Sequence, residues 1–110
     1  MFFISNEEEI KYNKGYCVIY FFAHWMPYHK KMIIMIEKMN EKYPNNKYFA
    51  INTDNFKNQC KRFNIKSIPT VLIFRNGLEI KRITGCVLTS AFTKAFADIF
   101  KTQEKYNVTK

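Results

Sequence analysis

The chemically reactive side chains of this sequence are three cysteines and two histidines. Cys17, Cys60 and Cys86 are an odd number at spacings of 43 and 26, so they form no disulfide framework and contain no C-x-x-C pair. A lone accessible thiolate can still attack a disulfide, whereas a buried thiol is inert. His24 and His29 have no third ligand or carboxylate nearby in the sequence, and such pairs rarely hold zinc. We therefore expect no metal and no cofactor.

Length and composition limit the architecture that can position these groups. The chain has 110 residues, of which 47% are hydrophobic and 17% aromatic. This length supports one hydrophobic core, and the aromatic content argues against disorder. With three Gly and three Pro, the chain is not a collagen-like or low-complexity polymer. We predict one domain over residues 1–103 and a short polar tail over residues 104–110.

The net charge of the chain is +9, from 18 basic and 9 acidic side chains. Only three of the basic residues are Arg, the side chain that reads bases by bidentate contacts, so we expect no nucleic acid as a partner. Two interpretations of the lysines stay open. They form either a solvated surface, favoured by an A/T-rich codon composition, or a surface that attracts an acidic partner.

The N-terminal segment and the apolar runs bear on the cellular compartment. The sequence begins with three apolar residues after Met1 and then turns acidic, which is neither a signal peptide nor a transit peptide. The longest apolar run, residues 17–23, is too short to cross a bilayer, so we expect no membrane association. A cytoplasmic location follows as our expectation.

Hydrophobic periodicity predicts alternating strands and helices. Residues 1–4 read as a strand, and a capping box from Ser5 to Glu8 opens a short helix to about Asn13. Residues 16–23 form a near-continuous apolar run that is typical of a strand buried on both faces. From Pro27 to about Tyr43, apolar residues recur at helical spacing.

The second half of the sequence continues the same alternation. We predict a strand over residues 48–52, a short helix over residues 56–63, a hairpin of strands 71–74 and 78–84, and a last helix over residues 91–99. The Arg75-Asn76-Gly77 turn joins the hairpin strands. The order is βαβαβαββα, an α/β protein with a central mixed sheet flanked by helices.

Two segments make this architecture specific. One is Asn64-Ile-Lys-Ser-Ile-Pro-Thr-Val-Leu-Ile-Phe-Arg-Asn-Gly77, and the other is Val18-Ile-Tyr-Phe-Phe-Ala-His-Trp25 followed by Lys30. The first resembles the segment of the thioredoxin family in which a cis-proline and a threonine lead into a strand. The second resembles the strand and loop before that family's Trp-Cys-Gly-Pro-Cys-Lys active site. Asp54 and Gly85 also match family positions, so the resemblance implies a thioredoxin fold over nearly the whole chain.

The sequence departs from the family where the family's chemistry occurs. The Cys-Gly-Pro-Cys segment becomes Met26-Pro27-Tyr28-His29, and the family's buried acid aligns with Tyr20. A thioether cannot attack a disulfide, and no second thiol follows it to resolve a mixed disulfide. The resemblance therefore predicts a redox-inactive member and no enzyme.

The retained proline indicates a function for such a protein. In the family, the residue before the cis-proline pairs with an extended peptide. We predict a non-catalytic protein-interaction module. Its partner would be a protein with an acidic surface, such as tubulin. A relative of this kind would be a cytoskeleton-associated, microtubule-binding thioredoxin-like protein. The predicted partner-binding groove comprises Trp25, Met26, Pro27, Tyr28, His29, Ile68 and Pro69.

The alternative function is a residual monothiol redox protein. Cys86 follows Gly85, which in the resemblance lies on the loop beside the cis-proline. A thiol there can form a mixed disulfide, whereas Cys17 and Cys60 lie on apolar faces and are expected to be inert core residues.

Overall fold

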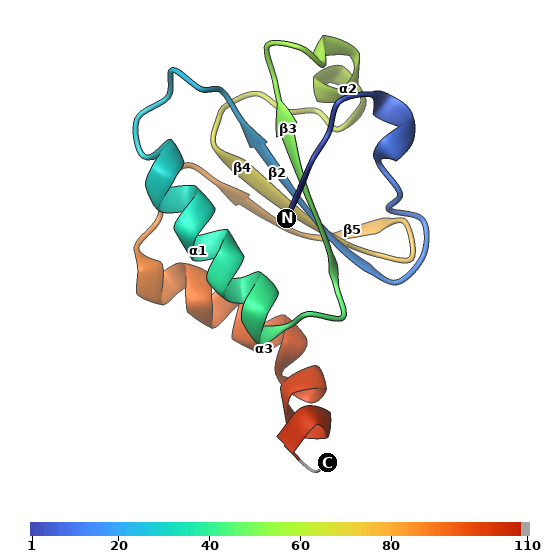
Figure 1. Ribbon diagram of the computed structural model, residues 1–110, viewed down its shortest axis with the longest axis vertical. Helices are drawn as coiled ribbons and strands as arrows, with labels where there is room; N and C mark the ends of the chain where they lie inside the picture. The colour runs from blue at the N-terminus through green and yellow to red at the C-terminus, as the bar shows by residue number, and fades with distance from the viewer. Residues whose placement is uncertain (109–110) are drawn as a thin grey trace.

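In the computed structural model, which describes the backbone of residues 1–108 and the side chains of residues 1–101, five strands form one mixed sheet (Figure 1). Their spatial order is β1-β3-β2-β4-β5. β1 and β2 run parallel to β3, whereas β4 is antiparallel to both β2 and β5. The strands are β1 (Phe2–Phe3), β2 (Tyr16–Phe22), β3 (Lys47–Asn52), β4 (Thr70–Arg75) and β5 (Leu78–Thr84).

Helices cover both faces of the sheet, as predicted. The helical elements are η1 (Glu7–Glu9), α1 (His29–Lys42), α2 (Lys57–Arg62) and α3 (Thr89–Val108). α1 and α3 pack on one face, where they share a core with β2 and β4. Residues around α2 and the segment after η1 close the second core on the other face. The predicted order of strands and helices is confirmed.

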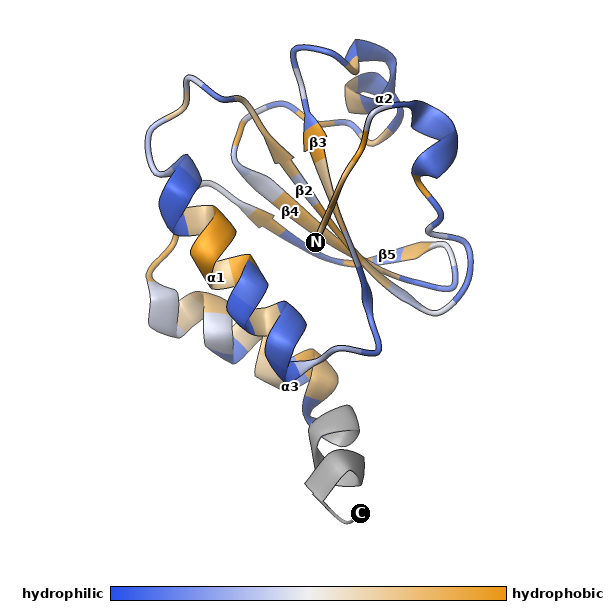
Figure 2. Cartoon of the chain, in the orientation of Figure 1, coloured by the Kyte–Doolittle hydropathy of each residue, from blue (hydrophilic) through white to orange (hydrophobic). Residues whose placement is uncertain are grey.

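The central strand β2 supplies side chains to both cores. Val18, Tyr20 and Phe22 enter the core under α1 and α3, while Cys17, Ile19 and Phe21 enter the opposite core. Successive side chains of a strand point to opposite faces, so a strand covered on both sides must be apolar throughout. This explains the unbroken apolar run, and Figure 2 shows hydrophobic colouring along much of the central strands, mixed with hydrophilic colouring in the edge strand β5.

Helix α1 begins two residues later than predicted. Pro27 lies outside it, and the N-cap residue Tyr28 has a left-handed φ of 68°. The chain therefore turns sharply before the helix instead of entering it at the proline. The predicted apolar stripe faces the core, and its buried members are Met32, Met35, Ile36 and Met39.

The predicted N-terminal helix is only the single 3-10 turn η1, and its cap is shifted by one residue. The Asn6 side chain accepts the Glu8 N–H at 3.0 Å, and the Glu9 carboxylate accepts the N–H groups of Ser5 and Asn6. These backbone donors hold the pKa of Glu9 below its ordinary value. Ile10 then adopts an extended conformation, which ends the turn.

At the C-terminal end, α3 continues to Val108. The proposed domain boundary at residue 103 falls inside this helix. Residues 109–110 of the predicted tail, and the side chains of residues 102–110, lie outside the described residues. The division into domain and tail stays a prediction.

Candidate functional site

The loop between β2 and α1 carries the two residues that align with the family's active-site cysteines, and neither is an exposed reactive group. Met26 is only 6% exposed and packs in the core under α1 and α3. Its N–H donates to the Ala23 carbonyl at 3.1 Å, which closes the loop inward. Met26 therefore does not supply the apolar groove surface that we expected, because the loop turns its side chain into the core.

His29 belongs to a packed aromatic group at the start of α1. Its Nδ1 lies 2.9 Å from the hydroxyl of Tyr20, which is fully buried. Its ring stacks on Phe22 with centroids 4.5 Å apart, and His24 approaches it edge-on at 5.6 Å. The hydrogen-bond partner of the His29 ring is therefore the side chain of Tyr20.

The surroundings of His29 and Tyr20 keep both side chains uncharged. Burial and the nearby His24 lower the pKa of His29 from its ordinary value. Burial, and to a smaller extent the charge of a Cys86 thiolate, raise the pKa of Tyr20. Tyr20 therefore keeps its proton and can donate to Nδ1 of a neutral His29.

Three other predicted residues lie at the surface of the same loop. Trp25 is 70% exposed and Tyr28 is 62% exposed, and Pro27 is exposed as well. The exposed rings of Trp25 and Tyr28 place apolar surface on the outside of this loop.

The segment before β4 meets the segment after β5. The Ile68–Pro69 peptide bond is cis, as the resemblance implied. Pro69 is buried, and its carbonyl accepts the Gly85 N–H at 2.8 Å. Gly85 has a positive φ of 83°, a conformation that disfavours other residues. This link holds the backbone just before Cys86 against Pro69.

The three thiols have different environments. Cys86 is exposed. Cys17 is fully buried, and burial raises its pKa to about 12. Cys60 is half-buried, and burial together with the charge of Asp54 raises its pKa. Only Cys86 combines access to solvent with a place beside Pro69, while the inertness expected of Cys17 agrees with its burial.

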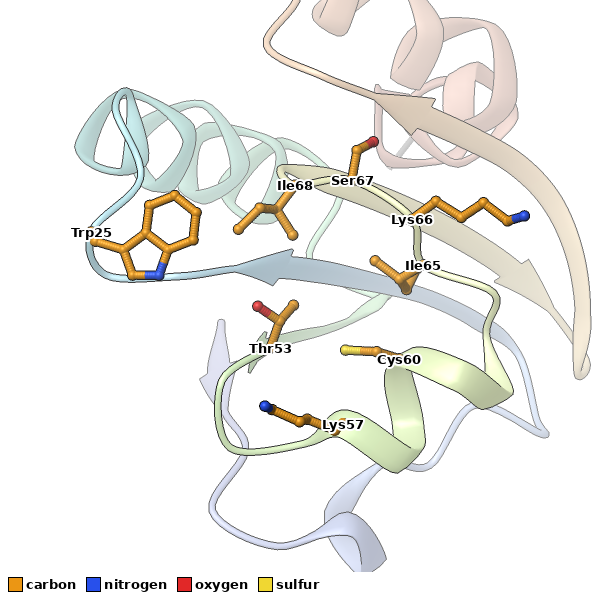
Figure 3. Close-up of a pocket in the computed structure, with 8 residues that line it drawn as sticks. All are labelled: Trp25, Thr53, Lys57, Cys60, Ile65, Lys66, Ser67 and Ile68. Carbon is orange, nitrogen blue, oxygen red and sulfur yellow. The ribbon is translucent and has the colours of Figure 1, made fainter.

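A pocket of about 280 Å³ adjoins the Ile68–Pro69 segment (Figure 3). Cys60, which we had placed in the core, forms part of its wall, so that placement was incomplete. Sequence reasoning could not find the pocket, because its walls come from three separate segments of the chain. The lining residues are Trp25, Thr53, Lys57, Cys60, Ile65, Lys66, Ser67 and Ile68.

The described residues provide neither a metal site nor a membrane span. Among the residues that the structure describes, no group of three or more His, Cys, Asp and Glu side chains could hold a metal ion. In the same part of the chain, every helix is too short or too polar to cross a membrane.

Comparison with known proteins identifies relatives of the chain. The family model described as Thioredoxin matches residues 4–98. Thioredoxin-1 of Saccharomyces cerevisiae is 31% identical over 68 residues, which are 62% of this chain and 66% of the yeast protein. The thioredoxin of Mycoplasma genitalium is 30% identical over 78 residues, which are 71% of this chain and 76% of that protein. The alignments therefore leave about a quarter to a third of these relatives unmatched.

Solved structures support the fold. The oxidised thioredoxin of Plasmodium falciparum superposes with a TM-score of 0.80 at 20% identity, covering 89% of this chain and 96% of that one. A mutant thioredoxin from Halobacterium salinarum gives a TM-score of 0.77 at 14% identity, covering 88% of each chain. The predicted thioredoxin fold is confirmed.

The same comparisons correct our functional prediction. We expected a non-catalytic interaction module that binds an acidic protein partner through the groove around Pro69. The relatives are instead named thioredoxins, which are redox proteins, so that prediction is contradicted. The error arose because we gave the loss of the two active-site cysteines more weight than the remaining thiol of Cys86. The alternative, a redox protein that uses Cys86, fits these relatives better.

Proposed function

Because the chain belongs to the thioredoxin family, we propose that it is a thiol–disulfide exchange protein that acts through one thiol, Cys86. The observation that carries this proposal is the position of that thiol. It is exposed, and it directly follows Gly85, whose N–H is bonded to the carbonyl of Pro69. The other two thiols are buried or half-buried with raised pKa values.

The proposed reaction is a simple exchange. The Cys86 thiolate attacks one sulfur of a substrate disulfide, the substrate S–S bond breaks, and a mixed disulfide with Cys86 forms. The other half of the substrate leaves as a thiolate and takes a proton from solvent. A second, low-molecular-weight thiol then attacks the mixed disulfide as a thiolate and releases Cys86 in its reduced form. One disulfide is reduced and one is formed, so electrons balance.

A two-cysteine cycle is not part of the proposal. Met26 and His29 occupy the positions that resemble the family's two cysteines, and a thioether carries no proton to lose. We expect that the protein does not reduce insulin disulfides by an intramolecular dithiol step. We therefore keep, as a proposal, only the part of our prediction that concerns the dithiol reaction of the family: this chain does not carry it out.

The partner and the cellular location of this reaction stay predictions. We propose that the partner is a protein that carries a disulfide, and that the reaction takes place in the cytoplasm. The cytoskeletal and microtubule-associated identity that we predicted gains no argument from the described residues.

The test is the formation and release of a mixed disulfide. The reduced protein is incubated with 2-hydroxyethyl disulfide, quenched with acid and analysed by intact mass and peptide mapping. We expect one adduct at Cys86, its loss in Cys86→Ser, and its retention in the matched variant Cys60→Ser. With excess 2-mercaptoethanol the adduct should be released. An adduct of equal yield on Cys86→Ser would overturn the proposal.

A further inference from the structure

The pocket beside Pro69 carries charge that the exchange reaction itself does not require. Lys57 and Lys66 line it together with the apolar side chains of Trp25 and Ile68. Figure 3 shows the two amines on opposite sides of the pocket, with the Lys57 amine near Thr53 and the Lys66 amine pointing outward. Both lysines are exposed, so their amines can swing towards a ligand.

The pocket and the thiol are both connected to one short segment, Ile68–Pro69. Ile68 forms part of the pocket wall, and the next residue, Pro69, accepts the hydrogen bond from Gly85. Cys86 follows Gly85 directly. Consecutive Cα atoms are at most about 3.8 Å apart, so a substrate of two or three residues attached to Cys86 can reach into the pocket.

The charge around the pocket is positive on balance. Among the residues with described side chains, neither Lys57 nor Lys66 forms an ion pair. Asp54 is an acid whose charge reaches the pocket wall, since it acts on Cys60. Two lysines and one acid therefore leave this edge of the pocket with one positive charge in excess. A positively charged rim beside an apolar wall is complementary to a ligand that carries carboxylates on a short apolar stem.

We propose that Lys57 and Lys66 are specificity-determining residues that select disulfides with carboxylates close to the sulfur as substrates of Cys86. The inference rests on the proposed exchange function and names its substrate class. Two sources share this chemistry: a small anionic peptide disulfide such as oxidised glutathione, and a disulfide in an acidic segment of a protein. In both, the carboxylates would occupy the lysine side of Ile68 while the sulfur meets Cys86.

The test compares disulfides of different charge with the whole chain. Rates of mixed-disulfide formation at Cys86 are measured by mass spectrometry with glutathione disulfide (anionic), 2-hydroxyethyl disulfide (neutral) and cystamine (cationic). Each rate is divided by the rate of the same disulfide with 2-mercaptoethanol, which removes differences in intrinsic reactivity. We expect the corrected rates to fall in the order anionic, neutral, cationic, and the spread to shrink as salt rises, because exposed charges are screened.

Variants assign the effect to the lysines. Lys57→Gln and Lys66→Gln should each lower the corrected glutathione disulfide rate by about threefold, and the double variant by about tenfold, the scale of exposed charge pairs. The neutral disulfide should react unchanged. Lys101→Gln, which removes the same charge from the exposed surface of α3, is the matched control and should have no effect. Asp54→Asn should raise the anionic rate.

A last experiment distinguishes a small peptide disulfide from an acidic protein segment as the substrate. It also distinguishes a failure of the exchange function from a failure of the lysine selectivity. A disulfide between a glutamate-rich cysteine peptide and 2-mercaptoethanol is compared with its glutamine counterpart. Lysine-dependent preference for either the glutamate peptide or glutathione disulfide supports the inference and identifies the source. If no disulfide reacts at Cys86, the exchange function itself is wrong. If all react and the double variant keeps the wild-type order of rates, the exchange function holds and this inference is overturned.

Discussion

The loop between β2 and α1 and the loop between β5 and α3 both adjoin the Ile68–Pro69 segment, but they present different chemistry there. In the first loop, Met26 is buried and His29 is stacked and hydrogen-bonded. In the second, Cys86 is an exposed free thiol. The comparison teaches that one scaffold offers two loops to the same segment, and that packing in one does not remove reactivity from the other.

A substitution of Phe22, the last residue of β2, tests whether the side chains packed at the first loop stabilise the fold. Phe22 is 1% exposed and stacks on both His29 and Tyr20. Phe22→Ala should lower the free energy of unfolding by about 3–5 kcal/mol, because it leaves a cavity in the core. Urea denaturation measures this loss. The control Trp25→Ala, at a side chain 70% exposed, should cost less than about 1 kcal/mol, and equal losses would show that the packing of Phe22 against His29 does not stabilise this region.

The second loop can be tested by the order in which the thiols react. Under native conditions a brief iodoacetamide pulse should label Cys86 first, Cys60 more slowly, and Cys17 at least about a hundredfold more slowly than Cys86. Burial raises the pKa of Cys17 to about 12, and the thiolate fraction falls about tenfold for each unit of pKa above the pH. Peptide mapping gives the three rates. Equal labelling in the folded protein would show that the loops do not differ in this way.

A pH titration sharpens the account of the first loop. The pKa of His29 is lowered from 6.5 in the folded chain, so the unfolded chain binds the proton more readily. The stability that neutral His29 contributes is complete above the unfolded pKa. It is lost as the pH falls below 6.5 towards the lower folded pKa.

Chemical denaturation between pH 8 and pH 5 measures this slope. His29→Gln should flatten it. His24→Gln should flatten it less, because burial is the larger cause of the lowered pKa and the charge of His24 the smaller. A wild-type slope that survives in His29→Gln would place the titrating group elsewhere.

The smallest effect is expected at the end of the first loop, in the turn that precedes α1. Tyr28 has a φ of 68°, its side chain is 62% exposed, and it makes no side-chain cap bond. A left-handed conformation costs a non-glycine residue about 1–2 kcal/mol. Tyr28→Gly should therefore raise stability by about 0.5 kcal/mol, after the entropy that glycine gains in the unfolded chain. Tyr28→Ala should bring no such gain, and thermal unfolding distinguishes the two variants.

Much of the fold was predictable because strand and helix periodicity depend on nearest neighbours along the chain. The apolar run of β2 and the methionine stripe of α1 are local patterns, and the structure places both as predicted. The starts of helices were less predictable. The position of Tyr28 outside α1 and the single turn of η1 depend on backbone conformations that no residue type there imposes.

The sequence by itself determined the family architecture, the loss of the two cysteines at Met26 and His29, and the place of Cys86 after Gly85. Only the tertiary structure decided how those residues are used. It buried Met26, joined His29 to Tyr20, and gathered Lys57, Cys60 and Trp25 around one pocket. The physical reason is that burial and proximity arise when segments far apart in the chain pack together. The spacing of residues along the sequence does not determine how far apart they lie in the folded protein.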